Sequence, residues 1–391
     1  MPESIGTPGP VLGVVGGGQL GRMMAEAAAP LGVELIVLDP TPDPPAAPVS
    51  RDTIIADFDV EDAMQELAER ADALTFEIEL ADPDLLERVG ESAGIPVHPS
   101  PDTLRTIEDK LVQKRELRAA GVPVPAFYPA DDPDDVREAV EAFGSVMLKA
   151  RTGGYDGRGN VPVTDADRAA EAFDAVGGAA MAETFVDFDR EISVIGAKGA
   201  DGIATFPIGE NVHEEEILRE TIVPSRSADG VEERARAVAR DVLELLDGRG
   251  VYGIELFEVD GDVLLNEIAP RPHNSGHWTI EGAITSQFEQ HVRAVLGWPL
   301  GATDRRVTTV TANLLGDVDE PEPATLYGVD RALSADGVSL HWYGKDEVRP
   351  LRKMGHLTAV EEDADPDALL DRARRIRDGL TFDPREGTGR P

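Results

Sequence analysis

The first hundred residues alternate short apolar runs with amphipathic segments, and this alternation constrains the fold more than any other feature. Four runs are typical of strands: VLGVV (11–15), VELIVLD (33–39), ALTFEIE (73–79) and IPVH (95–98). Helical patterns lie between them, at 19–31, 61–71 and 83–90. Two neighbouring strands can run parallel only if a long crossover connects them, and this crossover is usually a helix. Strands that alternate with helices therefore indicate a parallel sheet. The sequence therefore predicts an α/β domain, and the proline-rich break at 41–48 is interpreted as a loop within it.

The pattern changes after a predicted helical pair at 101–120, which is interrupted near Glu108 and Asp109. Extended segments and glycine-rich turns follow, with predicted strands at 146–151, 179–186, 190–199, 252–259 and 263–269. One long amphipathic helix is expected at 231–246. Such a mixture indicates an α+β domain. After Trp298 and Pro299, predicted strands at 308–316 and 339–344 and a helix at 366–379 suggest a smaller third unit.

The formal net charge of -38, from 75 acidic and 37 basic residues, excludes sequence-independent binding to nucleic acid or to anionic membranes. A cytoplasm at high salt, as in a halophile, would screen the repulsion on so acidic a surface. No apolar stretch is long enough to span a bilayer, so we expect a cytoplasmic protein without a membrane partner. The chain has no cysteine, so any metal must use oxygen or imidazole ligands. Lysine is scarce, which makes each lysine informative.

A first glycine motif, GGGQLG at 16–21, follows a predicted strand and opens a predicted helix. It fits G-x-G-x-x-G, and Asp39 ends the next strand where an acid that binds ribose would stand. An NAD-dependent oxidoreductase is therefore one alternative. Any tight turn beside a ligand needs glycines, however, and a helix N-terminus attracts any phosphate. A different phosphorylated ligand and a merely tight turn stay open, and the remainder of the chain argues against NAD.

A second glycine-rich segment, RTGGYDGRGN at 151–160, follows a predicted strand that carries Lys149. Its backbone N–H groups could contact a polyphosphate, and its mobility could let it close over the ligand. It is not a Walker loop, because no Gly-Lys-Ser/Thr follows. An ordinary surface loop is the alternative, but it would not explain Tyr155, Asp156 and Arg158 between the glycines. We therefore predict a nucleotide-binding loop.

A β-hairpin is predicted around Asp260 and Gly261. A three-residue loop would set Glu255 across from Glu267, whereas a two-residue loop would set Asn266 there. Facing carboxylates are destabilising unless a cation lies between them, and Mg²⁺ prefers such oxygen ligands. The alternative is a pair of glutamates on a solvated hairpin face.

Two further segments are rich in hydrogen-bond donors and cations. Residues 271–277, RPHNSGH, suit a polar substrate or a phosphate; a zinc pair formed by His273 and His277 is less favoured, because proline and glycine prevent a helix there. Residues 341–345 and 348–353 form the one strongly basic cluster, which suits an anion such as a substrate phosphate.

Taken together, GGGQLGRM, TFEIE, DKLVQK, KARTGGYDGRGN, NEIAPRPHNSGHWT and HWYGKDEVRPLRKMGH resemble the ATP-grasp superfamily, and within it the 5-(carboxyamino)imidazole ribonucleotide synthase family. The resemblance covers nearly the whole chain. It implies an α/β pre-ATP-grasp domain (1–108), an ATP-grasp domain (109–297) with a mobile lid at about 122–186, and a small C-terminal domain (298–391). It also implies a ligase that converts 5-aminoimidazole ribonucleotide, bicarbonate and ATP into the carboxyamino product, ADP and phosphate through carboxyphosphate, in purine synthesis.

The resemblance also implies roles for individual residues. ATP would contact Lys110, Lys149, Gly154, Tyr155, Asp156, Gly157, Arg158, Gly159, Asn160, Glu183, Thr184, Phe185, Val186, Glu191, His213, Asn266 and Glu267. Mg²⁺, or Mn²⁺, would bind Glu255 and Glu267. Aminoimidazole ribonucleotide would contact Gln19, Glu77, Tyr155, Asp156, Arg158, Arg271, Asn274, Ser275, Lys345 and Arg352. The catalytic residues would be Tyr155, Asp156, Arg158 and Arg271, with Asp156 orienting or deprotonating the amine. Lys110 replaces a common arginine, and Thr184 replaces one of two usual acids.

Partners follow from the same resemblance: a homodimer, and a functional link to the mutase that consumes the product. The nearest alternative function is another ATP-grasp ligase that joins a carboxylate or formate to an amine. A nucleotide sensor of the same fold would bind ATP without turnover.

Overall fold

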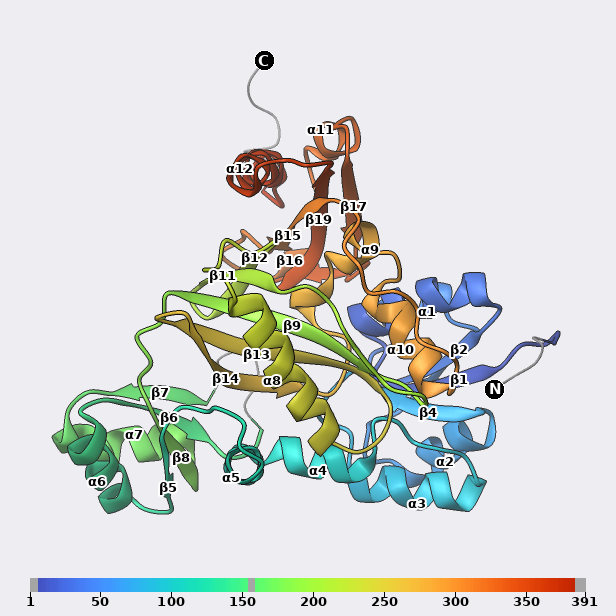
Figure 1. The fold of residues 1–391 in the computed structure, drawn as a ribbon. Coiled ribbons are helices and arrows are strands. Elements are labelled where there is room, and N and C mark those ends of the chain that lie inside the picture. Colours follow the sequence, from blue (N-terminus) through green and yellow to red (C-terminus); the bar gives the residue numbers. More distant parts are fainter. Residues whose placement is uncertain (1–5, 154–158, 384–391) are drawn as a thin grey trace.

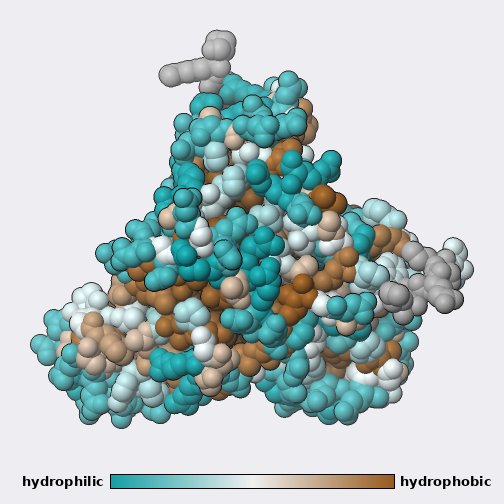
Figure 2. Space-filling model, viewed as in Figure 1, coloured by the Kyte–Doolittle hydropathy of each residue, from teal (hydrophilic) through white to brown (hydrophobic). Residues whose placement is uncertain are grey.

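The computed structural model describes residues 6–153 and 159–383. Figure 1 shows a central sheet with the N-terminal domain on one side, a small lobe on the other, and the C-terminal strands and helices above. Hydrophilic residues cover much of the surface in Figure 2, while hydrophobic residues gather in a band across the middle of that view. No helix in the described part of the chain is long and apolar enough to cross a membrane.

The N-terminal domain is the predicted parallel α/β unit. Its strands are β1 (Val11–Val15), β2 (Glu34–Asp39), β3 (Asp52–Ile55) and β4 (Ala73–Phe76), and its helices are α1 (Gln19–Ala28), α2 (Glu61–Glu69) and α3 (Pro83–Ala93). The strands lie in the order β3-β2-β1-β4, and every pairing is parallel. The strand β3 was not predicted, and the predicted strand at 95–98 is reduced to one bridge between Leu74 and Val97.

Both faces of this sheet are covered, as its continuous apolar strands require. Leu12 and Val14 pack with α1 and with Phe288 and Val292 of helix α10 (Gln287–Val295), which belongs to a much later part of the chain. Ile36 and other residues of the opposite face pack against α2 and α3. The N-terminal domain is therefore joined to the rest of the protein through a shared hydrophobic core.

Asp109 separates the two predicted connecting helices, α4 (Pro101–Glu108) and α5 (Lys110–Ala119). Its side chain accepts hydrogen bonds from the N–H groups of Leu111 (3.0 Å) and Val112 (3.2 Å), and so caps α5. The interruption near Glu108 and Asp109 is confirmed.

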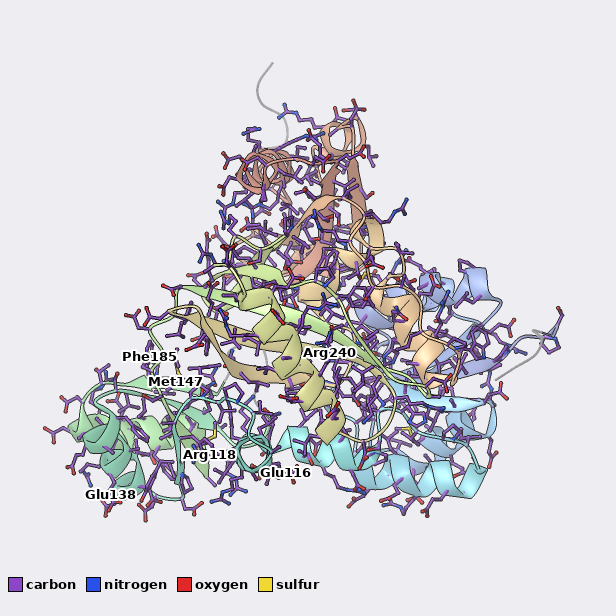
Figure 3. All side chains as sticks on the ribbon, in the orientation of Figure 1. Glu116, Arg118, Glu138, Met147, Phe185 and Arg240 are labelled. Carbon is purple, nitrogen blue, oxygen red and sulfur yellow. The ribbon has the colours of Figure 1, made fainter. Side chains whose placement is uncertain are left out.

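The small lobe is an antiparallel sheet in the order β5-β8-β6-β7. Its strands are β5 (Phe127–Ala130), β6 (Val146–Ala150), β7 (Asn160–Val163) and β8 (Ala180–Thr184). The helices α6 (Pro133–Phe143) and α7 (Ala169–Val176) share one hydrophobic core with it. Arg118 of α5 lies 3.7 Å from the ring centre of Phe127, and Figure 3 labels it beside this lobe.

The large sheet is antiparallel and runs β14-β13-β9-β11-β12-β15-β19-β17, with β10 paired to β9. Its strands are β9 (Arg190–Lys198), β10 (Ile203–Thr205), β11 (Gly209–Glu214), β12 (Ile217–Val223), β13 (Gly250–Val259), β14 (Asp262–Ala269), β15 (Thr308–Leu315), β17 (Val338–Trp342) and β19 (Lys353–Glu361). Helix α8 (Val231–Leu245) packs on one face, against residues that include Ile192, Ile254 and Leu265. Helix α8 does not cover the opposite face of the large sheet.

The last strands do not form a sheet of their own. β12 pairs with β15, for example through Glu220 and Ala312, so β15, β19 and β17 extend the large sheet. The remaining C-terminal elements are α11 (Val329–Leu333), α12 (Pro366–Arg377) and a short pairing of β16 (Glu322–Pro323) with β18 (Glu347–Val348). The domain limits at residues 108 and 297 stay predictions.

Candidate active site

A pocket lies where the small lobe, α5 and the large sheet meet. Its lining is polar and includes three of the six lysines in the chain: it comprises Lys110, Gln113, Lys114, Lys149, Asn160, Met181, Asn266 and Glu267. Five of these residues were expected to contact ATP, namely Lys110, Lys149, Asn160, Asn266 and Glu267. The fold thus brings together residues that are up to 157 positions apart in the sequence.

The predicted hairpin is present, but its register combines the two alternatives. Asp260 and Gly261 form a two-residue turn with positive φ at both positions, so Val259 faces Asp262. A β-bulge then shifts the register, so that Leu256 faces Leu265 and Glu255 faces Glu267. The bulge inserts Asn266 as the extra residue of β14, which restores the facing glutamates expected from a longer loop.

Glu255 and Glu267 differ strongly in their ionisation. Burial raises the pKa of Glu255 to about 7, even though His213 opposes the shift. Burial also acts on Glu267, but Lys110, 2.9 Å away, outweighs it and lowers the pKa of Glu267 to about 2. Because 48% of the Glu267 side chain is open to solvent, screening weakens this ion pair. The two carboxylates provide the oxygen donors that a divalent cation prefers.

A buried group of charges forms the floor of the pocket. The Lys149 ammonium lies 2.6 Å from Glu183 Oε1 and 3.3 Å from Asn266 Oδ1. Lys114 lies 2.8 Å from Glu183 Oε2 and donates to the Leu265 carbonyl at 2.9 Å. Sequence reasoning assigned no role to Lys114. The signal that could have found it was the scarcity of lysine, because a lysine kept in so arginine-rich a chain is informative.

The segment from Glu183 to Val186 ends β8 and leaves the small lobe. The Glu183 side chain is part of the charged floor of the pocket, between Lys149 and Lys114. The N–H groups of Thr184 and Phe185 donate to the carbonyls of Ala126 (2.8 Å) and Ser145 (3.2 Å), so neither N–H is available to a ligand. The Phe185 side chain is 53% exposed, and Figure 3 labels it near the junction of the small lobe and the large sheet. Contacts from Thr184, Phe185 and Val186 to ATP stay predictions.

Glu191 and His213 lie on the face of the large sheet that carries Glu255. Ser193 of β9 pairs with Glu255, and Glu191 pairs with Phe257, so the side chains of these residues share one face. The Glu191 carboxylate is 2.9 Å from His213 Nδ1. Burial opposes a charge on His213, but Glu191 outweighs it and raises the pKa of His213. The predicted ATP residues of β9 and β11 are thus neighbours of the predicted metal ligands.

The first glycine motif binds side chains of the protein itself. Gly17 N–H donates to Asp39 (2.8 Å), while the N–H groups of Gly18 and Gly21 donate to Glu77, the latter at 2.9 Å. A Cβ added at Gly16 would lie 2.5 Å from Glu77 Cγ. The glycines therefore make room for a buried carboxylate at the N-terminus of α1. Donors that a dinucleotide would require are already occupied, which argues against the NAD alternative. Gln19 opens α1 beside this carboxylate.

The loop after β14 has two side chains with polar partners, Arg271 and Ser275. A third side chain, Asn274, has no hydrogen-bond partner among the described residues. Arg271 Nη2 is 3.0 Å from Glu79 of the N-terminal domain, and Ser275 Oγ is 2.9 Å from His273 Nδ1. Both polar atoms of the Asn274 amide are buried and have no hydrogen-bond partner in the described part of the chain. No cluster of three metal-ligating side chains occurs there either, so the zinc alternative gains no support.

The basic cluster lies on the C-terminal strands. Lys345 Nζ donates to the Lys353 carbonyl at 2.7 Å, and Arg352 donates to the Glu347 carbonyl at 2.6 Å. Burial lowers the pKa of Arg352. The charge of Lys353 also contributes to the pKa of Glu255, after larger effects of burial, His213 and the other glutamates. The start of β19 is therefore close enough to Glu255 for their charges to interact.

Three stacked histidines join this cluster to the loop after β14. The ring of His356 lies 4.7 Å from His277 and 4.4 Å from His341, measured between ring centres. The basic cluster and the loop that carries Arg271 are consequently held together.

The predicted residues Gly154, Tyr155, Asp156, Gly157 and Arg158 lie outside the described residues. The flanking strands are described. Lys149 pairs with Asn160, and the Ala150 N–H donates to the Gly159 carbonyl at 2.8 Å. The two ends of the second glycine-rich segment (151–160) therefore lie beside the pocket.

Three family models match consecutive parts of the chain. They are described as ribonucleotide synthetase preATP-grasp domain (residues 10–108), ATP-grasp domain (115–288) and phosphoribosylaminoimidazole carboxylase C-terminal domain (309–367). These matches, with the lysine-lined pocket where the small lobe meets the large sheet, define an ATP-grasp protein.

Individual proteins narrow the assignment. The chain is 42% identical to the N5-carboxyaminoimidazole ribonucleotide synthase of Brucella melitensis over 360 residues, which cover 90% of this chain and 97% of that protein. It is 36% identical to the Bacillus subtilis synthase, with 93% and 95% covered. The chain belongs to the N5-carboxyaminoimidazole ribonucleotide synthase family.

Solved structures agree with this assignment. The Thermotoga maritima synthetase superposes with a TM-score of 0.85 at 39% identity, covering 95% of this chain and 99% of that one. The Aspergillus clavatus synthase, solved in complex with ADP and 5-aminoimidazole ribonucleotide, superposes with a TM-score of 0.86 at 33% identity, with 95% and 99% covered. The fold and family expected from the sequence are confirmed.

Proposed function

We propose that this protein is a ligase that carboxylates 5-aminoimidazole ribonucleotide, using ATP and bicarbonate, and forms N5-carboxyaminoimidazole ribonucleotide, ADP and phosphate in purine synthesis. The observation that carries the proposal is the pocket between the two sheets, in which Lys110, Lys149 and Lys114 surround Asn266 and Glu267. A polyphosphate needs such a concentration of cations. Membership of the synthase family supports the choice of substrates.

The reaction would proceed in two steps, phosphorylation of bicarbonate and carboxylation of the amine. A bicarbonate oxygen attacks the γ-phosphorus of ATP, the bond to the β-phosphate oxygen breaks, and ADP and carboxyphosphate form. The exocyclic amine of aminoimidazole ribonucleotide then attacks the carboxyl carbon, directly or after release of CO₂, while phosphate leaves and the amine loses a proton. Catalysis would depend on positioning and on neutralisation of charge, so no covalent enzyme intermediate is required.

Lys110 and Lys149 would bind the phosphates of ATP. Lys149 is directed by Glu183 and Asn266, and Lys110 by Glu267, so both ammonium groups are held in place before the nucleotide arrives. The glycine-rich segment at 151–160 would cover the phosphates, because both of its ends lie beside the pocket.

Glu255 and Glu267 fit a Mg²⁺ or Mn²⁺ ion. Two carboxylates face each other across one strand pair, and a cation between them would offset the burial and repulsion that raise the pKa of Glu255. When bound, the ion would neutralise phosphate charge. Glu191 and His213 would contact the nucleotide from the same face of the sheet.

The second substrate would bind between the N-terminal domain and the C-terminal strands. Its phosphate suits the basic cluster with Lys345 and Arg352, while Gln19 and Glu77 would contact the ribose side. Arg271, Asn274 and Ser275 would contact the same substrate from the loop after β14. Tyr155, Asp156 and Arg158 would meet the aminoimidazole, with Asp156 as the group that accepts the amine proton.

Further expectations belong to the same proposal: a cytoplasmic homodimer that works at high salt, and a functional link to a mutase that consumes the product.

One assay tests the proposal. In 2 M KCl with Mg-ATP, ADP release is measured with and without aminoimidazole ribonucleotide, and again without bicarbonate, while ¹³C-bicarbonate reports carboxylation of the amine. We expect ADP release that needs both co-substrates. Absence of ADP release that depends on aminoimidazole ribonucleotide would overturn the proposal: turnover with another amine would then favour a different ATP-grasp ligase, and ATP binding without turnover a sensor.

A further inference from the structure

Lys114 is the most deeply buried lysine at the candidate active site. Its side chain is 2% exposed, and Glu183, its ionic partner, is 3% exposed. Removing charges from water is costly unless they are paired and hydrogen-bonded. Burial accordingly lowers the pKa of Lys114 to about 8; Glu183 counteracts this in part, and Lys149 adds to it. Because burying the Lys114 ammonium group is energetically unfavourable, we expect this charge to have a role beyond packing.

The contacts of Lys114 join three parts of the fold. The residue belongs to α5, it meets Glu183 at the end of β8 in the small lobe, and it donates to the Leu265 carbonyl of β14 in the large sheet. Leu265 directly precedes the β-bulge at Asn266. One ammonium group therefore links the two sheets between which the pocket lies.

Glu183 divides its single negative charge between two lysines. Oε1 is 2.6 Å from Lys149, and Oε2 is 2.8 Å from Lys114. One carboxylate and two ammonium groups leave one positive charge in excess. With Lys114 absent, Glu183 would neutralise Lys149 completely and would lose the contact that orients its second oxygen.

We infer that Lys114 is a positioning residue of the nucleotide site: through Glu183 it keeps the Lys149 ammonium both directed and electrically available to an anion, and through the Leu265 carbonyl it holds the bulge that presents Asn266. This inference rests on the proposed binding of ATP to the pocket. It assigns no direct ATP contact to Lys114.

The test compares ATP binding by the full-length wild type and Lys114→Met, measured by equilibrium dialysis without the other substrates. We expect the dissociation constant for ATP to rise at least tenfold. Because the variant removes the excess positive charge, its ATP affinity should also depend less on KCl concentration than that of the wild type.

Lys198→Met is the matched control. Lys198 is also partly buried and donates to two carbonyls, those of Leu243 (2.8 Å) and Leu246 (2.5 Å), at the far face of the large sheet. Its loss should lower stability without changing ATP affinity or its salt dependence. An equal loss of ATP affinity in both variants would show a general structural effect and overturn the inference.

A double-mutant cycle with Glu183→Gln separates a route through Glu183 from an independent effect. In the Glu183→Gln background, Lys114→Met should reduce ATP affinity by a smaller factor than in the wild-type background, because only the contact with the Leu265 carbonyl remains to be lost. This double variant also removes the unpaired buried carboxylate that could impair folding. Additive effects, or an unchanged affinity in Lys114→Met alone, would overturn the inference. If the wild type itself does not bind ATP, the proposed function fails instead.

Discussion

Glu267 lies directly across the β13–β14 hairpin from Glu255, and the two carboxylates have pKa values near 2 and near 7. The difference arises because Lys110 contacts Glu267 and lowers its pKa. At Glu255 the effect of burial is larger than the opposing effect of His213, so its pKa rises. The pair therefore provides one permanent negative charge and one carboxylate that a cation would stabilise.

Replacement of Glu255 by glutamine should lower enzymatic activity without lowering the free energy of unfolding. The amide removes one of two facing carboxylates, so the free energy of unfolding should stay the same or rise. Loss of a metal ligand should nevertheless lower the rate of ADP release about 100-fold or more. Urea denaturation and the ADP assay measure both quantities. Glu244→Gln, on the exposed side of α8, serves as the control and should change neither. A Glu255→Gln enzyme with normal turnover would contradict the metal assignment.

Asp156→Asn should impair carboxylation far more than ATP binding. A positioned acid–base group contributes roughly 100-fold to 10,000-fold to the rate of a proton transfer. We therefore expect product formation to fall at least about 100-fold, with the dissociation constant for ATP within about twofold of the wild-type value. Rapid-quench measurement of product and equilibrium dialysis with ATP provide the comparison, and Asp174→Asn on the exposed side of α7 is the control. Near-normal product formation would remove Asp156 from the catalytic role.

His291 should make the protein sensitive to acid. It is fully buried, its Nδ1 accepts from Val251 N–H (3.1 Å), and its Nε2 lies 2.8 Å from Thr75 Oγ1. Burial, with a smaller effect of His98, lowers the pKa of His291 from 6.5 to about 3. Between these values the unfolded chain binds a proton that the folded protein does not, so stability falls as the pH decreases.

The expected contribution is about 1.4 kcal/mol of unfolding free energy per pH unit for this one proton. Urea denaturation of wild type and His291→Gln at pH 7, 6 and 5 in 2 M KCl measures it. The variant should be less stable at pH 7 but should lose less stability on acidification. Parallel losses in the two proteins would show that His291 is not responsible.

High salt should stabilise the protein. With a net charge of -38, like charges repel over distances that shorten from about 10 Å to about 3 Å between 0.1 M and 1 M salt. We expect the midpoint of urea denaturation to rise between 0.1 M and 2 M KCl. Sucrose at equal osmolality, which does not screen charge, should raise it less. A midpoint independent of KCl would refute a role of salt.

Local patterns predicted the elements well where one segment determines its own structure. The sequence predicted the helix interruption near Glu108 and Asp109, whereas the structure adds that the Asp109 side chain caps the second helix. The alternation in the first hundred residues predicted the parallel sheet. The strand β3 was missed because four residues after a proline-rich loop carry too little periodicity to be recognised.

Contacts between distant segments could not be predicted from the same patterns. The bulge at Asn266 depends on packing around β14, so the turn residues alone suggested two registers. The glycines at 16–18 resemble a phosphate loop in sequence, yet the Gly17 N–H donates to Asp39 and the Gly18 N–H donates to Glu77, about 60 residues later. Lys114 illustrates the same limit, because its importance follows from Glu183 and Leu265, which the sequence does not place beside it.

The pairing of β12 with β15 has a consequence for dissection of the protein. A cut at residue 297 would leave β12 and β15 as two long unpaired edges, each able to pair with another molecule. The central and C-terminal parts, although distinct in sequence, should aggregate when expressed separately. They should regain solubility when coexpressed, because the two edges complete one continuous sheet.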